Sequence, residues 1–155
     1  MVTFGLSSIE GSADESPNYL NAMRFQNTAG TGNLVKLEIL IDDISPTGNV
    51  RMGIYADNNG SPGSRLLDAG EVNVSNGWVG SSGLNLPVTQ GTYYWLVFVL
   101  QSTNRVSGRT GQPANSHHWY YYAYNALPSP YNVNGTDHGS SDAQWAMRAT
   151  VSVGP

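Results

Sequence analysis

The stretch GTYYWLVFVL, residues 91–100, decides the fold class of this chain. A half-buried β-strand alternates apolar and polar residues, whereas this segment is apolar on both parities. It is short for a buried helix, and β-branched and aromatic side chains dominate it. We therefore predict a central strand with one face in the core and a second face that is covered by a loop or offers aromatic rings to a ligand. The two predicted faces are Tyr94, Leu96, Phe98 and Leu100, and Tyr93, Trp95, Val97 and Val99.

Alternating apolar residues recur in three further segments, residues 33–42, 50–56 and 145–153. The residues expected to point inward are Val35, Leu37, Ile39 and Ile41; Val50, Met52, Ile54 and Ala56; and Trp145, Met147, Ala149, Val151 and Val153. Polar, glycine-rich stretches at 102–116 and 126–143 are expected to be long loops. About eight or nine such strands predict an all-β fold, an antiparallel jelly-roll-type β-sandwich. Residues 1–155 are expected to form a single domain.

The composition limits the kinds of molecule that this chain is expected to bind. The chain has 155 residues, no cysteine, 12% charged residues and a net charge of −4, so a nucleic-acid partner is not expected. No apolar run is long enough for a membrane span. Polarity comes mainly from Gly, Ser, Asn and Thr, which suits the surface of an extracellular or cell-surface protein.

Aromatic residues are densest in HHWYYYAY, residues 117–124. On a strand, Tyr120, Tyr122 and Tyr124 share one face. Sugar rings stack their apolar C–H faces on flat aromatic rings, while polar side chains bind the hydroxyls. These three tyrosines are therefore candidate carbohydrate-binding residues. The alternative is that they belong to the apolar core of a sandwich.

Three more residues are candidates for sugar binding. Arg51 and Tyr55 lie opposite the inward parity of their strand, so they are expected to be exposed together on a sheet face. A solvated face with one covering tyrosine is the alternative for this pair. Trp78 lies beside a turn, in Asn-Gly-Trp, and is the third candidate. Trp95 and Trp145 share parity with apolar neighbours and are assigned to the core.

Metal-binding patterns are sparse. Asp57 begins an Asp-Asn-Asn-Gly stretch that resembles half of a calcium loop, so it is a candidate calcium ligand. The distal Glu of such loops is missing, and an Asx-rich turn is the preferred interpretation. His117 and His118 are adjacent and should point to opposite faces of a strand, so no zinc site is expected from the three histidines. No other cofactor is expected.

No catalytic pattern emerges from the acidic, serine or histidine residues. The nucleophile elbow Gly-x-Ser-x-Gly is absent. The acidic residues are scattered and do not form the alternating carboxylates that glycoside hydrolysis requires. We expect that the chain is not an enzyme.

Three segments resemble a pattern found in secreted prokaryotic jelly-roll β-sandwich modules. They are VRMGIYADNNGSPGSRLL (50–67), LPVTQGTYYWLVF (86–98) and ALPSP (126–130), within a resemblance that spans roughly residues 33–153. Such modules are similar to carbohydrate-binding modules appended to glycoside hydrolases and to surface or adhesive proteins. The resemblance implies the sandwich fold and a secreted location, and it transfers no ligand residue to this chain.

The sequence therefore favours a non-catalytic carbohydrate-binding module for a polysaccharide, acting by aromatic stacking and hydrogen bonding. A catalytic domain of the same parent chain is a candidate partner. The first alternative is a structural domain of a cell-surface, adhesive, filament or viral attachment protein, which would use sheet edges or long loops. The second alternative is a glycan-cleaving enzyme.

Overall fold

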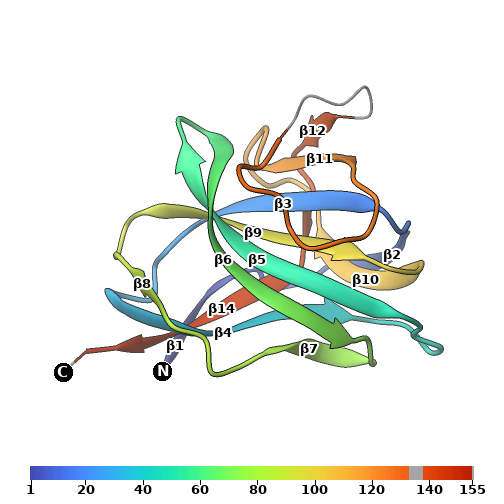
Figure 1. Ribbon diagram of the computed structural model, residues 1–155, viewed down its shortest axis with the longest axis horizontal. Helices are drawn as coiled ribbons and strands as arrows, with labels where there is room; N and C mark the ends of the chain where they lie inside the picture. The colour runs from blue at the N-terminus through green and yellow to red at the C-terminus, as the bar shows by residue number, and fades with distance from the viewer. Residues whose placement is uncertain (133–137, 155) are drawn as a thin grey trace.

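Two antiparallel sheets stack face to face in this protein (Figure 1). The structure is a computed structural model that describes residues 1–132 and 138–154. No helix occurs in this described part of the chain, and thus none that is long and apolar enough to cross a membrane. The predicted all-β antiparallel sandwich is confirmed.

Sheet A has the strand order β1-β14-β4-β10-β13, with β2 paired to β10 and with β7 and β8 paired to β4. Its strands are β1 (Val2–Gly5), β2 (Gly11–Glu15), β4 (Gly32–Ile41), β7 (Gly77–Ser81), β8 (Leu86–Val88), β10 (Asn104–Arg109), β13 (Gln144–Trp145) and β14 (Met147–Val153).

Sheet B has the strand order β12-β11-β3-β9-β5-β6, which places β9 between β3 and β5. The strand that was predicted to be central, β9, therefore lies in the interior of sheet B. The strands of sheet B are β3 (Tyr19–Gln26), β5 (Asn49–Asn58), β6 (Ser61–Asn73), β9 (Tyr93–Leu100), β11 (His117–Tyr121) and β12 (Gly139–Ser141).

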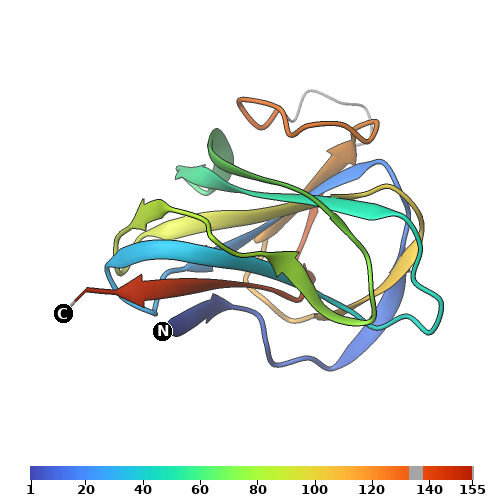
Figure 2. The same cartoon turned by 60° about the horizontal axis from the view of Figure 1, so that its bottom comes forward.

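The two predicted faces of β9 lie in different apolar clusters. Tyr94, Leu96, Phe98 and Leu100 pack between the two sheets, in the main core. Trp95, Val97 and Val99 point to the outer face of sheet B and are buried in a second cluster. That cluster is closed by the segment 122–131, which we call the strap. The strap follows β11 and lies above sheet B in Figure 2, in orange. A loop therefore covers the second face of β9.

Four details of the expected strand pattern are wrong. Leu34, not Val35, is buried in the core, because β4 carries a β-bulge: Thr150 pairs with Lys36 and the next residue, Val151, pairs with Leu34. Val153 was expected inward but is 45% exposed at the end of β14. The expected loop at 102–116 contains β10, and the one at 126–143 contains β12.

Candidate functional site

The strap buries two of the predicted sugar-binding tyrosines. Tyr55 was expected to be exposed, and this is wrong: its side chain is 0% exposed, because the strap lies over it. Its hydroxyl donates a hydrogen bond to the Pro128 carbonyl. Tyr120 is 7% exposed, and both rings meet Tyr131 of the strap edge-on, at centroid distances of 5.5 Å and 5.2 Å. Neither ring presents a face to solvent while the strap is in place.

Several contacts fix the strap on sheet B. Arg65 donates to the Leu127 carbonyl at 2.6 Å, and the Tyr131 hydroxyl donates to the Leu20 carbonyl at 2.7 Å. Leu127 fills the space above Gly53, where an added Cβ would come within 2.5 Å of the leucine Cδ1. The strap is therefore part of the folded core and leaves no open platform beneath it.

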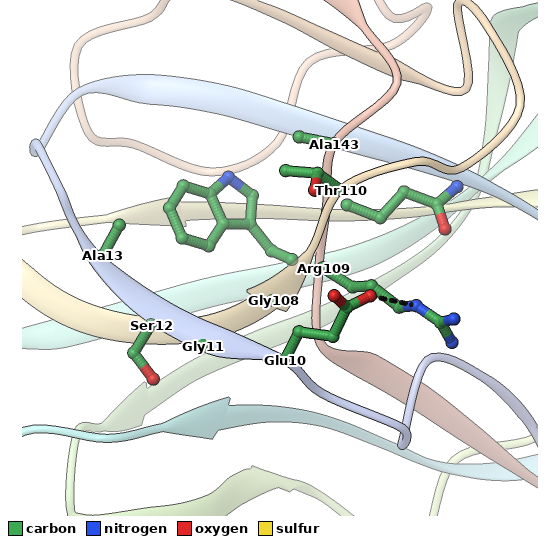
Figure 3. Close-up of a pocket in the computed structure, with 10 residues that line it drawn as sticks. Glu10, Gly11, Ser12, Ala13, Gly108, Arg109, Thr110 and Ala143 are labelled. Carbon is green, nitrogen blue, oxygen red and sulfur yellow. Dashed lines mark hydrogen bonds and ion pairs between the residues drawn. The ribbon is translucent and has the colours of Figure 1, made fainter.

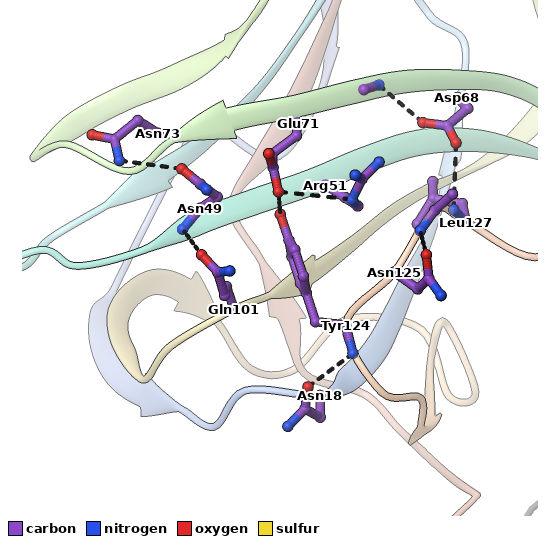
Figure 4. A network of polar contacts seen from close by, with 12 residues as sticks. Asn18, Asn49, Arg51, Asp68, Glu71, Asn73, Gln101, Tyr124, Asn125 and Leu127 are labelled. Atoms are coloured by element: carbon purple, nitrogen blue, oxygen red, sulfur yellow. Dashed lines mark hydrogen bonds and ion pairs between the residues drawn. The ribbon is translucent and has the colours of Figure 1, made fainter.

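Three other predicted residues gather at the edge of the strap, and Figure 4 shows two of them, Arg51 and Tyr124. The Tyr124 hydroxyl donates to Glu71 at 2.6 Å, and the Nε of Arg51 lies 3.9 Å from the same carboxylate. The Arg51 guanidinium lies 5.6 Å from the Tyr124 ring centroid. Tyr122 is half-buried beside them and donates its hydroxyl to the Ala126 carbonyl. The structure thus brings Arg51, Tyr122 and Tyr124 together. Both tyrosine hydroxyls are hydrogen-bonded, whereas the Nε of Arg51 is buried without a hydrogen-bond partner among the described residues.

Trp78 lies apart from this group, on β7 of sheet A. Its neighbour Val79 points into the core, so the Trp78 ring lies on the outer face of sheet A. The Arg148 guanidinium stacks on that ring at 3.9 Å and donates to Glu38 at 3.0 Å. The predicted sugar-binding residues therefore occupy two different sheets.

Asp57 is held by protein groups. Its carboxylate accepts hydrogen bonds from Arg24, at 2.9 and 3.0 Å, and from the Trp95 indole, at 2.9 Å. Burial acts to raise the pKa of Asp57, but these hydrogen bonds outweigh it and hold the pKa below its usual value. Within residues 1–132 and 138–154, no three His, Cys, Asp or Glu side chains gather as a metal site.

An open pocket of about 340 Å³, which we call the Trp145 pocket, lies where β2, β10 and β13 meet (Figure 3). It is lined by Glu10, Gly11, Ser12, Ala13, Gly108, Arg109, Thr110, Ala143, Gln144 and Trp145. The strand register places Gly108 opposite both Trp145 and Gly11. Because the two glycines carry no side chain, the backbone is bare beside the indole ring, and an added Cβ on Gly108 would come within 3.4 Å of that ring.

Polar groups with unused hydrogen-bonding capacity surround this apolar wall. At the rim, the Nε of Arg109 donates to an oxygen of Glu10 at 2.8 Å, as Figure 3 shows. This contact leaves the two terminal nitrogens of Arg109 and the second carboxylate oxygen of Glu10 without a partner among the described residues. The Trp145 indole N–H likewise has no acceptor there.

The assignment of Trp145 to the core was correct only in part. The ring packs against the edge of the main core, but it is half-buried and forms a wall of the pocket. Glu10 and Arg109 are 99 residues apart in the chain. Only the register of β10 with β2 and β13 brings them to Trp145, so no local sequence signal marks this site.

A two-sheet sandwich of this shape belongs to the same fold class as a lectin-like domain. The solved structures that it matches are of Cwp84, a surface layer associated protein of Clostridium difficile. One, described as its cysteine protease and lectin-like domains, matches with a TM-score of 0.59 at 14% identity over 91% of this chain. The other, described as the clostridial cysteine protease after propeptide cleavage, matches with a TM-score of 0.61 at 15% identity over 92%.

These matches show a shared fold. The chain spans about a third of the matched proteins, 34% and 38% of their chains. No protein-family model and no curated protein sequence matches the chain.

Proposed function

We propose that this chain is a non-catalytic carbohydrate-binding domain and that its sugar lies in the Trp145 pocket. The observation that carries the proposal is the combination found there: a half-exposed indole wall, bare glycine backbone, and an ion pair with unused donors and an unused acceptor. A sugar ring needs a flat apolar surface for its C–H face and paired polar groups for its hydroxyls. Both lie within one pocket.

The proposed binding mode follows from those groups. The sugar stacks against Trp145, and neighbouring hydroxyls bind the terminal nitrogens of Arg109 and the second oxygen of Glu10. The volume of about 340 Å³ is near the lower end of the range of about 300–1,000 Å³ for small-molecule sites. A pocket of this size suits one or two sugar units of a longer polysaccharide.

The likeness to a chain that contains a lectin-like domain supports this function. Cwp84 is described as surface layer associated, which supports a location at the cell surface. In that protein the lectin-like domain accompanies a cysteine protease domain. By analogy, a catalytic domain of the same parent chain is the proposed neighbour here, with this domain holding it near a polysaccharide.

The group at the strap edge is the competing surface for the same function. Arg51, Tyr122 and Tyr124 are partly exposed and close together. A sugar bound there would have to displace the Tyr124–Glu71 hydrogen bond of 2.6 Å. The Trp145 pocket requires no such exchange, and for this reason we favour it.

A binding experiment with matched tryptophan variants tests the proposal. Polysaccharides that bind the native domain are first identified on a glycan array, and their affinities are then measured for Trp145→Ala, Trp78→Ala and Tyr124→Phe. We expect Trp145→Ala to weaken binding about tenfold or more, equivalent to about 1.4 kcal/mol, and the other two variants to bind like the native domain. Trp78→Ala is the matched control, because it removes a half-buried indole from the outer face of sheet A.

Four results would contradict the proposed site or function. Native-like affinity in a folded Trp145→Ala variant rules out the pocket, and a selective loss in Tyr124→Phe moves the site to the strap edge. No binding to any glycan contradicts carbohydrate binding itself. Release of new reducing ends from a bound polysaccharide contradicts the proposal that the domain is non-catalytic.

A further inference from the structure

A second pocket, which we call the polar pocket, lies at one end of sheet B. It has a volume of about 420 Å³ and lies between the turn that follows β5 and the loop before β11. Its polar lining residues include Arg24, Asn115, Ser116, His118 and Ser140. None of the described residues that line it is Trp, Tyr or Phe, so a ligand here would be held mainly by hydrogen bonds and not by stacking.

Two buried polar atoms in residues of this wall have no hydrogen-bond partner among the described residues. They are Oγ of Ser116, a residue that is 3% exposed, and Nε2 of His118, a residue that is 8% exposed. Buried polar groups in folded proteins are nearly always paired with protein or with ordered water, because an unpaired group costs stability. Both residues line the polar pocket, so a molecule in this pocket is the candidate for the missing partner.

The protein fixes both residues before any ligand enters. The His118 ring meets the Trp95 ring edge-on at a centroid distance of 5.0 Å, and its Nδ1 is hydrogen-bonded to Nε2 of His138 at 3.4 Å. The backbone carbonyl of Ser116 accepts a hydrogen bond from the backbone N–H of Arg24 at 2.9 Å. Little affinity would therefore be lost to ordering these groups when a ligand binds.

The charges around the pocket favour a neutral ligand over an anion. The Arg24 guanidinium donates two hydrogen bonds to the Asp57 carboxylate, at 2.9 and 3.0 Å, so its charge is balanced. Burial, together with the nearby His138, lowers the pKa of His118, so this imidazole is neutral at pH 7. A hydroxyl group both donates and accepts, which matches a serine hydroxyl and a neutral imidazole, whereas an ionised carboxylate only accepts.

The polar pocket adjoins the Trp145 pocket. Gln144 lines the Trp145 pocket, and its side-chain amide donates to the carbonyls of Arg24 and Ser116, at 3.1 and 3.4 Å, which belong to residues of the polar pocket. The loop 110–116 also runs from the wall of the first pocket to the wall of the second. A single side chain thus bridges the two walls.

We propose that the polar pocket is a second carbohydrate subsite, which binds a further sugar unit of the polysaccharide held at Trp145 through hydrogen bonds to Ser116 and His118. The inference rests on the carbohydrate-binding function proposed above. Hydroxyls of the sugar supply the partners that Oγ of Ser116 and Nε2 of His118 lack. Nη1 of Arg24, which takes no part in the two bonds to Asp57, is a further donor on the same wall.

Replacing Ser116 tests this subsite, with a polysaccharide that binds the native domain on a glycan array as the probe. Ser116→Ala should lower the affinity about three- to tenfold, the effect of one hydrogen bond. Its melting temperature should not fall, because the hydroxyl has no partner among the described residues to lose. Ser81→Ala is the matched control: it removes a hydroxyl that donates to the Ala69 carbonyl at 3.1 Å, on β7, and should bind like the native domain.

The possible outcomes separate this inference from the proposed function. Native-like affinity in Ser116→Ala, with weakened binding in Trp145→Ala, overturns the second subsite and leaves carbohydrate binding standing. Weaker binding that is accompanied by a lower melting temperature overturns the subsite as well, because the hydroxyl would then hold the fold. Saturable binding of inorganic phosphate that Ser116→Ala abolishes assigns the pocket to an anion instead. No glycan binding by the native domain contradicts both the subsite and the function.

Discussion

Trp95 and Trp145 have the same side chain, but the fold buries the first completely and leaves the second partly exposed. Trp95 is fully buried under the strap region, and its indole N–H donates to Asp57 at 2.9 Å. Trp145 is half-buried, and its N–H has no acceptor among the described residues. The first ring has all its contacts within the protein, whereas the second retains surface and a donor for a ligand.

The same contrast holds for the regions around the two rings. The outer face of sheet B gathers many aromatic residues, among them Tyr55, Tyr120 and Tyr131, but these rings pack on one another and on the strap. The Trp145 pocket has a single aromatic residue and two glycines. The density of aromatic residues in the sequence therefore marks a second core, and the candidate site lies where an aromatic ring has no aromatic partner among the described residues.

The largest expected effect on stability comes from replacing Trp95, the buried tryptophan of the two. Trp95→Ala should lower the free energy of unfolding by about 3–5 kcal/mol, because it removes a fully buried indole. Urea denaturation followed by circular dichroism measures the loss, with Trp145→Ala as the matched variant. An equal loss in the two variants would contradict the distinction between the two tryptophans.

The strap should be the next most sensitive feature. Leu127→Ala should cost about 2–3 kcal/mol, because Leu127 is 2% exposed and fills the space above Gly53. Hydrogen exchange should also become faster in the strap and stay unchanged in β14. A stable variant with unchanged exchange would mean that the strap does not seal this face.

The Asp57 contact predicts a dependence of stability on pH. Its pKa is lower in the folded state than in the unfolded chain, so its stabilising effect is present above about pH 4 and is lost as the pH falls below that value. Asp57→Asn should therefore cost about 1–3 kcal/mol at neutral pH and less at about pH 3. Urea denaturation at both values measures this difference, and an equal cost at both would argue against an ionised Asp57 as the stabilising species.

The smallest expected effect on stability is in the Trp145 pocket. Arg109→Gln breaks the ion pair with Glu10, whose side chains are 40% and 63% exposed, and should change stability by less than about 1 kcal/mol. Affinity for a bound polysaccharide should nevertheless fall. Thermal melts and affinity electrophoresis on the same preparation check both, and a large loss of stability would show that the pair holds the fold.

Much of the fold follows from local sequence patterns. The two apolar parities of residues 93–100 predicted that β9 would be central and covered on both sides. Strand β10 was not predicted within residues 102–116, because Val106 is its only large apolar residue and small residues follow it. The inward position of Leu34 was not predicted either. Alternation along a strand gives the side-chain direction only when the strand is regular, and β4 carries a bulge.

The candidate site depends on pairing between distant strands, which parity does not reveal. Gly11, Gly108 and Trp145 meet only through register across sheet A. His118 and His138 likewise meet through β11 and β12. The sequence paired Arg51 with Tyr55, whereas the structure brings Arg51 to Tyr124. Tyr55 was predicted to be exposed and is buried, because the strap returns over sheet B.

Gln144 has a consequence for how the Trp145 pocket would respond to a ligand. From β13 of sheet A, its side-chain amide donates to the carbonyls of Arg24, at 3.1 Å, and Ser116, at 3.4 Å, which belong to β3 and to the loop before β11. These bonds cross between the layers at the open edge of the sandwich and oppose sliding of one sheet over the other. The walls beside Trp145 are thus preorganised, so a ligand entering there would lose little affinity to ordering the protein.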